Sequence, residues 1–208
     1  MSINSSLVVI LAGGKGKRLD GQGKFSVNLR GLSLIQHVIN RLVSQTKNIV
    51  INTSYENKFI HKLGYKCIED VMIDSDSLHG YGPLAGIHSA LNYGSFLNGK
   101  SSYVITVPVD TPFLPNNLIK KFILSNEKHE KKISVASSKG RIHPTIAMWP
   151  CSLKNNISKA LRDGIRKIDS FTEVYKIDYL NWNDKNDPFF NINSPNDLLE
   201  AEKRIDLT

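Results

Sequence analysis

Cysteine is scarce in this chain of 208 residues, where only Cys67 and Cys151 occur. They lie far apart in the sequence, and neither has a histidine or a second cysteine at the spacings that metal sites use. The pattern therefore predicts neither a disulfide nor a cysteine-bound metal. We expect both residues to be small, buried apolar side chains.

The chain also lacks a long apolar run and an export signal. Its first apolar run, Leu7–Ala12, has no basic leader and stops at Gly13 and Gly14, so it is too short for a signal core or a membrane span. With 40% apolar and 22% charged residues, the composition is that of a globular protein. We expect a single domain over residues 1–208, a cytoplasmic location and no membrane contact.

Acidic residues are outnumbered, because 27 Lys and Arg residues stand against 19 Asp and Glu residues and give a net charge of +8. A basic surface attracts anions, and nucleic acid is one candidate. The charge is dispersed, however, and its densest patches are Lys15–Arg18 and the mixed-sign segment around Lys128–Lys132. Basic and aromatic residues do not alternate as they do in single-strand binders. We expect no nucleic-acid partner, because a small polyphosphate substrate explains the first patch more simply.

Apolar runs and helical periodicities alternate along the chain. Continuous aliphatic and β-branched runs predict strands at residues 7–11, 48–53, 66–68, 103–107, 133–136, 145–149 and near 173–177. Helical spacing and cap signals predict helices at residues 33–43, 55–63, from 82 onward, 115–126, 152–161 and 195–204. This order favours an α/β fold in which a mostly parallel sheet has helices on both faces. Ligands of such folds bind beyond the carboxyl ends of the strands, where Ala12–Lys24, Asp70 and Asp110 are expected.

The segment from Leu11 to Lys24 carries the strongest functional signal; it reads Leu-Ala-Gly-Gly-Lys-Gly-Lys-Arg-Leu-Asp-Gly-Gln-Gly-Lys. Its glycines let the backbone approach phosphates, and exposed amides in such a loop form an anion-binding nest. Arg18 and Lys24 can neutralise a triphosphate and the charge that develops on departing pyrophosphate. The segment contains neither a P-loop nor a G-x-G-x-x-G fingerprint. A flexible, solvated basic loop is the alternative, and a binding loop is the better interpretation.

Asp110 follows a predicted buried strand and lies between Pro108 and Pro112. A carboxylate held there suits a Mg²⁺ ligand that bridges phosphate oxygens. Asp-Thr-Pro is also good turn chemistry, so Asp110 could instead cap the helix predicted from Pro115. Beside the glycine-rich loop, metal binding is the favoured interpretation. Asp70 follows another strand and fits a nucleotide contact or a turn cap.

Taken together, these segments resemble the nucleotidyltransferases that have a Rossmann-like fold, and the Ala12-Gly13-Gly14 form of the loop points to the molybdenum cofactor guanylyltransferases. Further segments agree in order and spacing and extend the resemblance over nearly the whole chain: Glu69-Asp70, Gly82-Pro83-Leu84-Ala85-Gly86, Asp110-Thr111-Pro112-Phe113-Leu114-Pro115, His143-Pro144-Thr145 and Asn191-Ile192-Asn193-Ser194-Pro195-Asn196-Asp197-Leu198. The resemblance implies a three-layer sandwich. Residues 1–115 would mainly bind the nucleotide, and residues 116–208 would mainly bind the acceptor.

The resemblance also implies a role for each matching residue. Lys24 and Arg18 would act on the phosphates, and Asp110 would bind both Mg²⁺ and the nucleotide. Asn52 and Asp70 would help to hold the guanine and the ribose. The backbone beside the nucleotide would come from Leu11, Ala12, Gly13, Gly14, Gly82, Pro83 and Leu84. The acceptor would be contacted by Arg141 and His143, and Asn191 and Asn193 would approach the metal or the acceptor.

The loop departs from the family pattern before its lysine. Where the family usually has Gly-Gly-x-Asp-Lys, this chain has Asp20-Gly21-Gln22-Gly23-Lys24. The acidic residue before the lysine is missing and Asp20 replaces a glycine, while Lys24 stays in register. These departures bear on the conformation of the loop.

Two basic features on the acceptor side allow two interpretations each. A lone histidine before a proline, such as His143, more often holds a turn than acts in catalysis. We expect no general base there, because a phosphate nucleophile is already ionised at neutral pH. The segment Arg162–Lys167 fits a grip on the acceptor phosphate or an exposed helix end.

The function that the resemblance implies is transfer of GMP from GTP to the molybdenum-bearing pterin phosphate, molybdopterin, with release of pyrophosphate. Mg²⁺ would be the cofactor, and cofactor-handover proteins or apo-molybdoenzymes would be transient partners. Two alternatives stay open. One is a nucleotidyltransferase that uses CTP or a sugar-phosphate acceptor. The other is a nucleotide-sensing module without catalysis, and the departures from the family pattern at Asp20 and Gly23 are the features that favour it.

Overall fold

A seven-stranded sheet runs through the part of the chain that the computed structural model describes, which comprises residues 6–13, 23–53, 57–71, 82–98, 103–128 and 132–205. The strand order is β5-β4-β1-β6-β8-β7-β9. The strands are β1 (Leu7–Leu11), β4 (Ile49–Asn52), β5 (Lys66–Ile68), β6 (Tyr103–Pro108), β7 (Ile133–Ser138), β8 (Arg141–Pro150) and β9 (Ile177–Trp182). A separate hairpin pairs β2 (Asn28–Leu29) with β3 (Leu32–Ser33).

The pairing of the strands makes the sheet mostly parallel, as the sequence predicts. β1 lies between β4 and β6 and is parallel to both, β4 is parallel to β5, and β7 is parallel to β9. Only β8 runs the other way, between β6 and β7. The carboxyl ends of the parallel strands therefore share one edge of the sheet with the start of β8.

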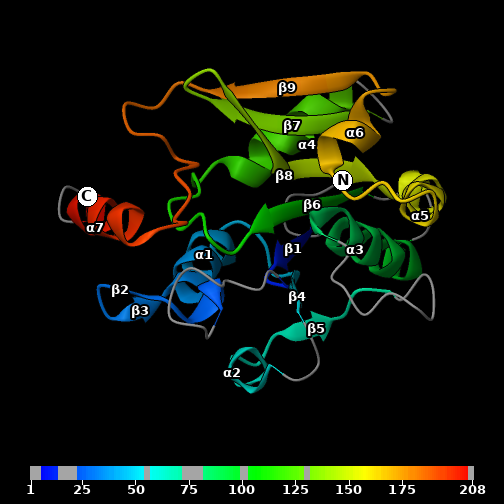
Figure 1. Ribbon diagram of the computed structural model, residues 1–208. Coiled ribbons are helices and arrows are strands. Elements are labelled where there is room, and N and C mark those ends of the chain that lie inside the picture. Colours follow the sequence, from blue (N-terminus) through cyan, green and yellow to red (C-terminus); the bar gives the residue numbers. More distant parts are fainter. Residues whose placement is uncertain are drawn as a thin grey trace.

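Helices cover both faces of the sheet, which completes the predicted three layers (Figure 1). On one face, α1 (Leu34–Val43) and α4 (Leu118–Lys128) pack against the sheet. On the other face lie α3 (Pro83–Asn98), α5 (Lys154–Arg162) and α6 (Ile168–Thr172). The remaining helices are α2 (Lys58–His61) and α7 (Pro195–Ile205), with short 3-10 turns at Lys24–Ser26 and Cys151–Leu153.

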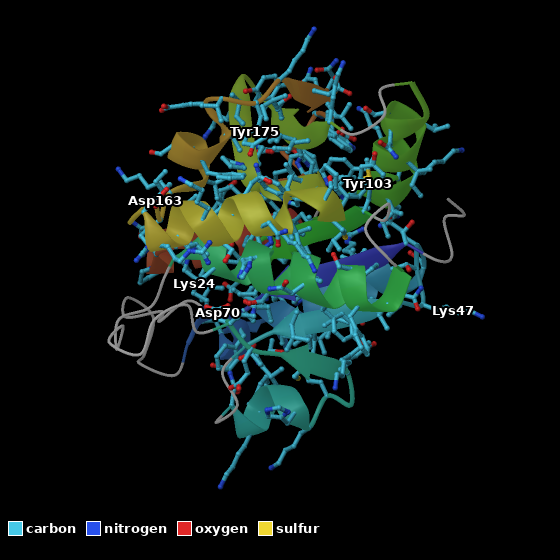
Figure 2. The ribbon with its side chains drawn as sticks, turned by 90° about the vertical axis from the view of Figure 1, so that its right-hand side faces the viewer. Lys24, Lys47, Asp70, Tyr103, Asp163 and Tyr175 are labelled. Atoms are coloured by element: carbon cyan, nitrogen blue, oxygen red, sulfur yellow. The ribbon has the colours of Figure 1, made fainter. Side chains whose placement is uncertain are left out.

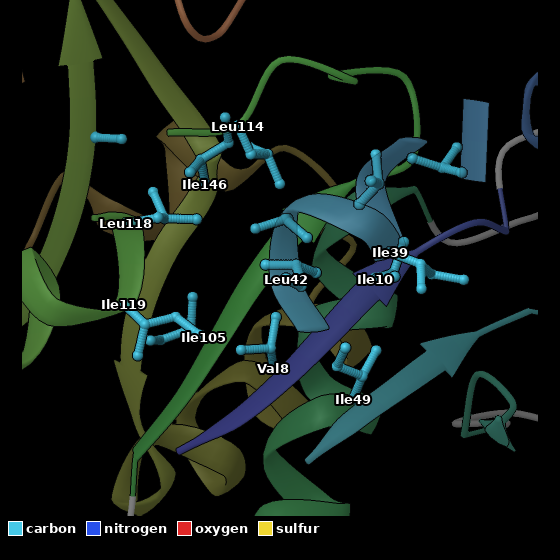
Figure 3. Packing of buried hydrophobic residues seen from close by; sticks show 14 of the residues in the cluster. Val8, Ile10, Ile39, Leu42, Ile49, Ile105, Leu114, Leu118, Ile119 and Ile146 are labelled. Atoms are coloured by element: carbon cyan, nitrogen blue, oxygen red, sulfur yellow. The ribbon is translucent and has the colours of Figure 1, made fainter. Parts of the chain in front are cut away.

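Alternating side chains of β1 enter the hydrophobic cores on the two faces of the sheet. Val8 and Ile10 face α1 and α4, whereas Leu7 and Val9 face α3. Figure 3 shows Val8 and Ile10 packed with Ile39 and Leu42 of α1 and with Ile105 of β6. A continuous apolar run is therefore required at β1, because both faces of this strand are buried.

The start of α1 shows how local sequence sets an element that frames the site. Ser33 precedes the helix, its backbone N–H donates to the Gln36 side chain over 2.9 Å, and the two side chains form a capping box. The apolar residues Leu34, Ile35, Val38, Ile39 and Leu42 recur at helical spacing and are all buried. The helix predicted from Ser33 is confirmed.

Two expectations about the elements are corrected. The helix predicted from Pro115 begins at Leu118, since the Leu118 N–H closes a turn onto the Pro115 carbonyl over 3.1 Å. The strand predicted near residues 173–177 is wrong: β9 spans Ile177–Trp182. Val174 in the predicted strand is 84% exposed, and the buried pair Ile168 and Phe171 forms the unexpected helix α6 before it.

Other features were only partly predicted. The strand predicted at residues 145–149 is the buried end of the longer β8, and the β2–β3 hairpin was not predicted at all. Neither cysteine forms a disulfide; Cys151 is buried as expected, whereas Cys67 is only half-buried, and loss of water raises its pKa. In the described ranges, no helix is long and apolar enough to cross a membrane.

Candidate functional site

The carboxyl ends of the central strands meet at one end of the molecule. In Figure 2, Lys24 and Asp70 lie at this end, whereas Lys47, which precedes β4, and Tyr103, the first residue of β6, lie at the other. Backbone bonds join the three strand ends: the Ala12 N–H donates to the Asn52 carbonyl over 2.8 Å, and the Val109 N–H donates to the Leu11 carbonyl over 3.2 Å. The predicted backbone contacts Leu11, Ala12 and Gly13 are therefore at this edge, while Gly14 and Arg18 lie outside the described residues.

Lys24 brings the glycine-rich segment to the end of β6. Its Nζ lies 2.5 Å from Oδ2 of Asp110 and also donates to Oδ1 of Asn193. The lysine and aspartate side chains are 24% and 11% exposed. Gly23, with φ of 93°, turns the backbone into the short helix that carries Lys24, a conformation that favours glycine. The ammonium group of Lys24 thus links two other predicted site residues, Asp110 and Asn193.

The Asp110 carboxyl group has one oxygen left over. Oδ1 is buried and, among the described residues, has no hydrogen-bond partner. Buried polar atoms are nearly always paired, so an unpaired carboxylate oxygen needs an explanation. The capping alternative does not supply one, because α4 begins only at Leu118 and Oδ2 is bonded to Lys24. The backbone carbonyl of Asp110 accepts the Ile192 N–H over 2.9 Å, which ties this turn to the next segment.

The segment that carries Asn193 is held from both sides. Ile192 is fully buried in a third cluster with Leu29, Leu34 and Ala201, whereas Asn191 is exposed and Asn193 is partly buried. The backbone N–H groups of Asn193 and Ser194 both donate to Oδ2 of Asp197, each over 2.9 Å. These bonds from Asn193 and Ser194, with the nearby charge of Lys24, lower the pKa of Asp197, although partial burial opposes them.

Asp197 was not among the predicted site residues, yet the sequence contained a signal for it. Ser194-Pro195-Asn196-Asp197 matches the Ser/Thr-x-x-Asp/Glu pattern that caps a helix. The return bond is present, since the Asp197 N–H donates to the Ser194 hydroxyl over 3.2 Å. Asn191, which was predicted on the acceptor side, is exposed.

Asn52 and Asp70 form a second cluster, at the ends of β4 and β5. The Asn52 side chain is 3% exposed, and its Nδ2 donates to Oδ1 of Asp70 over 3.0 Å. A Cβ on Gly86 would lie 2.7 Å from Oδ1 of Asn52, so only glycine allows α3 to approach this closely. Asp70 is exposed on one side, but loss of water on its protein side raises its pKa, with Glu69 acting in the same direction and the Asn52 bond opposing it.

The Gly82–Gly86 turn begins α3 beside this cluster. Pro83 is the first residue of the helix, as predicted, and both Gly82 and Pro83 are exposed. Leu84 is fully buried in the core, so its backbone, and not its side chain, is available for the predicted nucleotide contact.

On the acceptor side, Arg141 and His143 lie at the start of β8. Arg141 is exposed, and His143 is half-buried with its ring centroid 5.0 Å from that of Phe189. Nε2 of His143 is 2.9 Å from the Ser138 hydroxyl. Burial lowers the pKa of His143, a charge on Asp187 opposes this shift, and Arg141 adds to it. The bond to Ser138 gives the histidine the structural role expected of it, while its acceptor role stays a prediction.

The basic segment Arg162–Lys167 turns back on its own helix. Arg162 donates to the Ser158 hydroxyl over 2.9 Å, and Arg166 donates to the carbonyls of Leu161 and Ile165. These bonds fit the helix-end interpretation of the segment. Its Asp163 nevertheless lies at the same end of the molecule as Lys24 and Asp70 (Figure 2).

Comparison with known proteins gives consistent findings. Residues 8–176 match the family described as the MobA-like NTP transferase domain. The chain is 35% identical to a molybdenum cofactor guanylyltransferase of Rhodopseudomonas palustris, over 94% of this chain and 91% of that protein. It is 33% identical to a protein of the same name from Yersinia pestis, over 94% of this chain and 95% of that protein.

Two solved structures share the fold. The molybdopterin-guanine dinucleotide biosynthesis protein A of Archaeoglobus fulgidus has a TM-score of 0.74 and 25% identity, with 97% of this chain and 99% of that chain covered. A CMP:2-keto-3-deoxy-manno-octonic acid synthetase complexed with CTP has a TM-score of 0.71 and 12% identity, with 97% of this chain and 98% of that chain covered. The second likeness shows the fold alone.

Proposed function

Because the chain belongs to the family of MobA-like NTP transferases, we propose that it transfers GMP from GTP to the phosphate of molybdopterin and releases pyrophosphate. The product would be the guanine dinucleotide form of the cofactor. The observation that carries this proposal is the contact of the Lys24 ammonium with both Asp110 and Asn193 at the carboxyl ends of β1 and β6. In nucleotide-binding α/β folds, phosphates and the metal that neutralises their charge bind at this edge of the sheet.

The residues at this point fit a divalent metal. Asp110 offers a buried oxygen, Oδ1, that has no partner among the described side chains. Its other oxygen and Oδ1 of Asn193 already surround a positive charge, that of Lys24. Hard oxygen ligands of this kind are those that Mg²⁺ prefers, often one or two carboxylates completed by phosphates. We assign Mg²⁺ to Asp110, where the bound ion would neutralise phosphate charge during transfer.

The chain's own residues would then align two anions. The acceptor phosphate is already ionised, so the barrier lies in bringing it in line with the α-phosphate and in absorbing the charge that develops. Lys24, together with Arg18, would contact the triphosphate and stabilise the departing pyrophosphate. An ammonium group has three N–H donors, so Lys24 can contact the phosphates while it keeps its bond to Oδ2 of Asp110, and Oδ1 stays open to the metal.

The Asn52–Asp70 pair supports the placement of the nucleoside. Nδ2 of Asn52 donates to Oδ1 of Asp70, and the Asp70 carboxylate keeps further lone pairs that can accept N–H or O–H donors of guanine or ribose. The acceptor would lie over β8 and the Asn191–Asn193 segment. Handover proteins or apo-molybdoenzymes as partners, and a cytoplasmic location, stay predictions.

The proposal is tested by pyrophosphate release with molybdopterin, Mg²⁺ and each of the four ribonucleoside triphosphates in turn. We expect release with GTP alone. Release with CTP would keep the reaction and overturn the choice of base. If GTP bound without any release, the nucleotide-sensing alternative would replace the proposed activity.

A further inference from the structure

A serine, a histidine and an aspartate meet at the acceptor end of the sheet. Ser138 ends β7, His143 lies near the start of β8, and Asp187 belongs to the segment between β9 and α7. The Ser138 hydroxyl lies 2.9 Å from Nε2 of His143 and 2.6 Å from Oδ1 of Asp187. Figure 1 shows the chain leaving β9 and passing the β7–β8 end of the sheet on its way to α7. Ser138 is fully buried, so these bonds are shielded from water.

The direction of the bonds follows from the number of protons. A carboxylate only accepts hydrogen bonds, and Oδ1 of Asp187 also takes the Phe189 N–H over 3.0 Å. The Ser138 hydroxyl has a single proton, which it donates to Asp187. Its oxygen must therefore accept from His143, which requires a proton on Nε2.

The second nitrogen of His143 is then left with a lone pair. Burial favours the neutral ring by lowering the pKa of His143. Among the residues that the structure describes, Nδ1 has no hydrogen-bond partner, and it is not fully buried. A neutral ring with Nε2–H therefore presents Nδ1 to solvent as a hydrogen-bond acceptor.

The same contacts connect His143 to the reacting end of the molecule. The segment that bears Asp187 packs Phe189 against the imidazole and continues to Asn193, which contacts Lys24. Asp187 therefore holds both the histidine and the beginning of the Asn193 segment in place.

We propose that Ser138 and Asp187 are positioning residues of the acceptor site, which hold His143 so that Nδ1 accepts a hydrogen bond from an N–H donor of the acceptor. The inference rests on the proposed function, because a pterin ring carries such N–H groups. It goes further by giving two residues that are not expected from the sequence a role in binding the acceptor.

The first test is the protonation of His143 in the ligand-free full chain, measured by nitrogen-15 NMR of its side chain. We expect the Nε2–H form. Ser138→Ala removes the group that selects this form, so we expect the preference to weaken and KM for molybdopterin to rise about threefold to tenfold, the effect of one neutral hydrogen bond. KM for GTP should stay within about twofold, because the GTP contacts lie elsewhere.

Ser125→Ala is the matched control, since the Ser125 hydroxyl also donates to an aspartate, Asp178, and among the described residues it has no hydrogen bond to a histidine. It should change neither His143 nor KM for molybdopterin. If Ser138→Ala does not fold, Asp187→Ala takes its place with the same expectations.

The outcomes separate this inference from the proposed function. The Nδ1–H form in the unchanged protein, or a folded Ser138→Ala variant with unchanged KM for molybdopterin, would overturn the inference while GMP transfer remained. Absence of transfer by the unchanged protein would refute the proposed function, and with it the acceptor role, whatever form His143 takes.

Discussion

Replacement of Lys24 by methionine should increase the affinity of the nucleotide-free protein for a divalent metal. The Lys24 ammonium lies 2.5 Å from Oδ2 of Asp110 and contacts Asn193, so it occupies the oxygen-lined position that a metal at Asp110 would need. A metal that binds Asp110 without nucleotide is repelled by this ammonium charge and competes with it for the carboxylate. Lys24→Met keeps an apolar stem of similar length and removes the competing charge.

The size of the effect follows from the strength of the ion pair. Two unit charges about 4 Å apart interact by about 1 kcal/mol in water and about 4 kcal/mol at the effective dielectric constant near a protein surface. Since the two side chains are 24% and 11% exposed, solvent screens part of this attraction. We expect a gain of about 1.4 to 2.8 kcal/mol, which is tenfold to a hundredfold in metal affinity.

The assay is a titration with Mn²⁺ followed by electron paramagnetic resonance, without nucleotide or acceptor. Lys47→Met is the control, because Lys47 lies at the opposite end of the molecule (Figure 2). A second variant that combines Lys24→Met with Asp110→Asn should lose the gain. Equal Mn²⁺ affinity of the unchanged protein and folded Lys24→Met would refute the idea that the lysine holds the place of the metal.

Two further predictions concern the parts that shape the site. Gly86→Ala would place a Cβ 2.7 Å from Oδ1 of Asn52 and displace the Asn52–Asp70 pair. We therefore expect GTP binding, measured by calorimetry, to weaken about tenfold. Unchanged GTP affinity would contradict the placement of the nucleoside beside this pair. The lowered pKa of Asp197 means that its carboxylate stabilises the fold above its unfolded pKa of about 3.9 and loses this contribution as the pH falls through the lower folded value. Urea unfolding should therefore find Asp197→Asn less stable than the unchanged protein at pH 7 but nearly equal to it at the acid end of the curve, and a difference independent of pH would contradict this linkage.

The sequence was a good guide where local pattern and tertiary burial agree. The apolar run of β1 and the apolar spacing in α1 predict their elements because the same residues are buried in the structure. The prediction near residues 173–177 failed because Val174 looks like a strand residue but is exposed, while Ile168 and Phe171 fill the core as α6. A strand pattern cannot distinguish these cases without knowledge of which surface is free to be covered.

The candidate site shows a similar limit. Lys24 and Asp110 were each predicted from a single segment of sequence, but the two residues that make contact are 86 positions apart. The sequence alone therefore could not decide whether Asp110 is a metal ligand or a helix cap. Asp197 had a recognisable capping pattern that points to a helix start and not to its contact with the Asn193 backbone. Ser138 and Asp187 are 49 positions apart and carry no local motif, so only the folded chain brings them together.

The most direct test of the proposed function identifies the product itself. The protein is incubated with GTP, molybdopterin and Mg²⁺, and the products are analysed by mass spectrometry. We predict the guanine dinucleotide of the pterin, one pyrophosphate for each dinucleotide formed, and loss of both in folded Asp110→Ala. A pterin dinucleotide that forms equally well with CTP, or undiminished product in Asp110→Ala, would contradict the assignment of GMP transfer to this site.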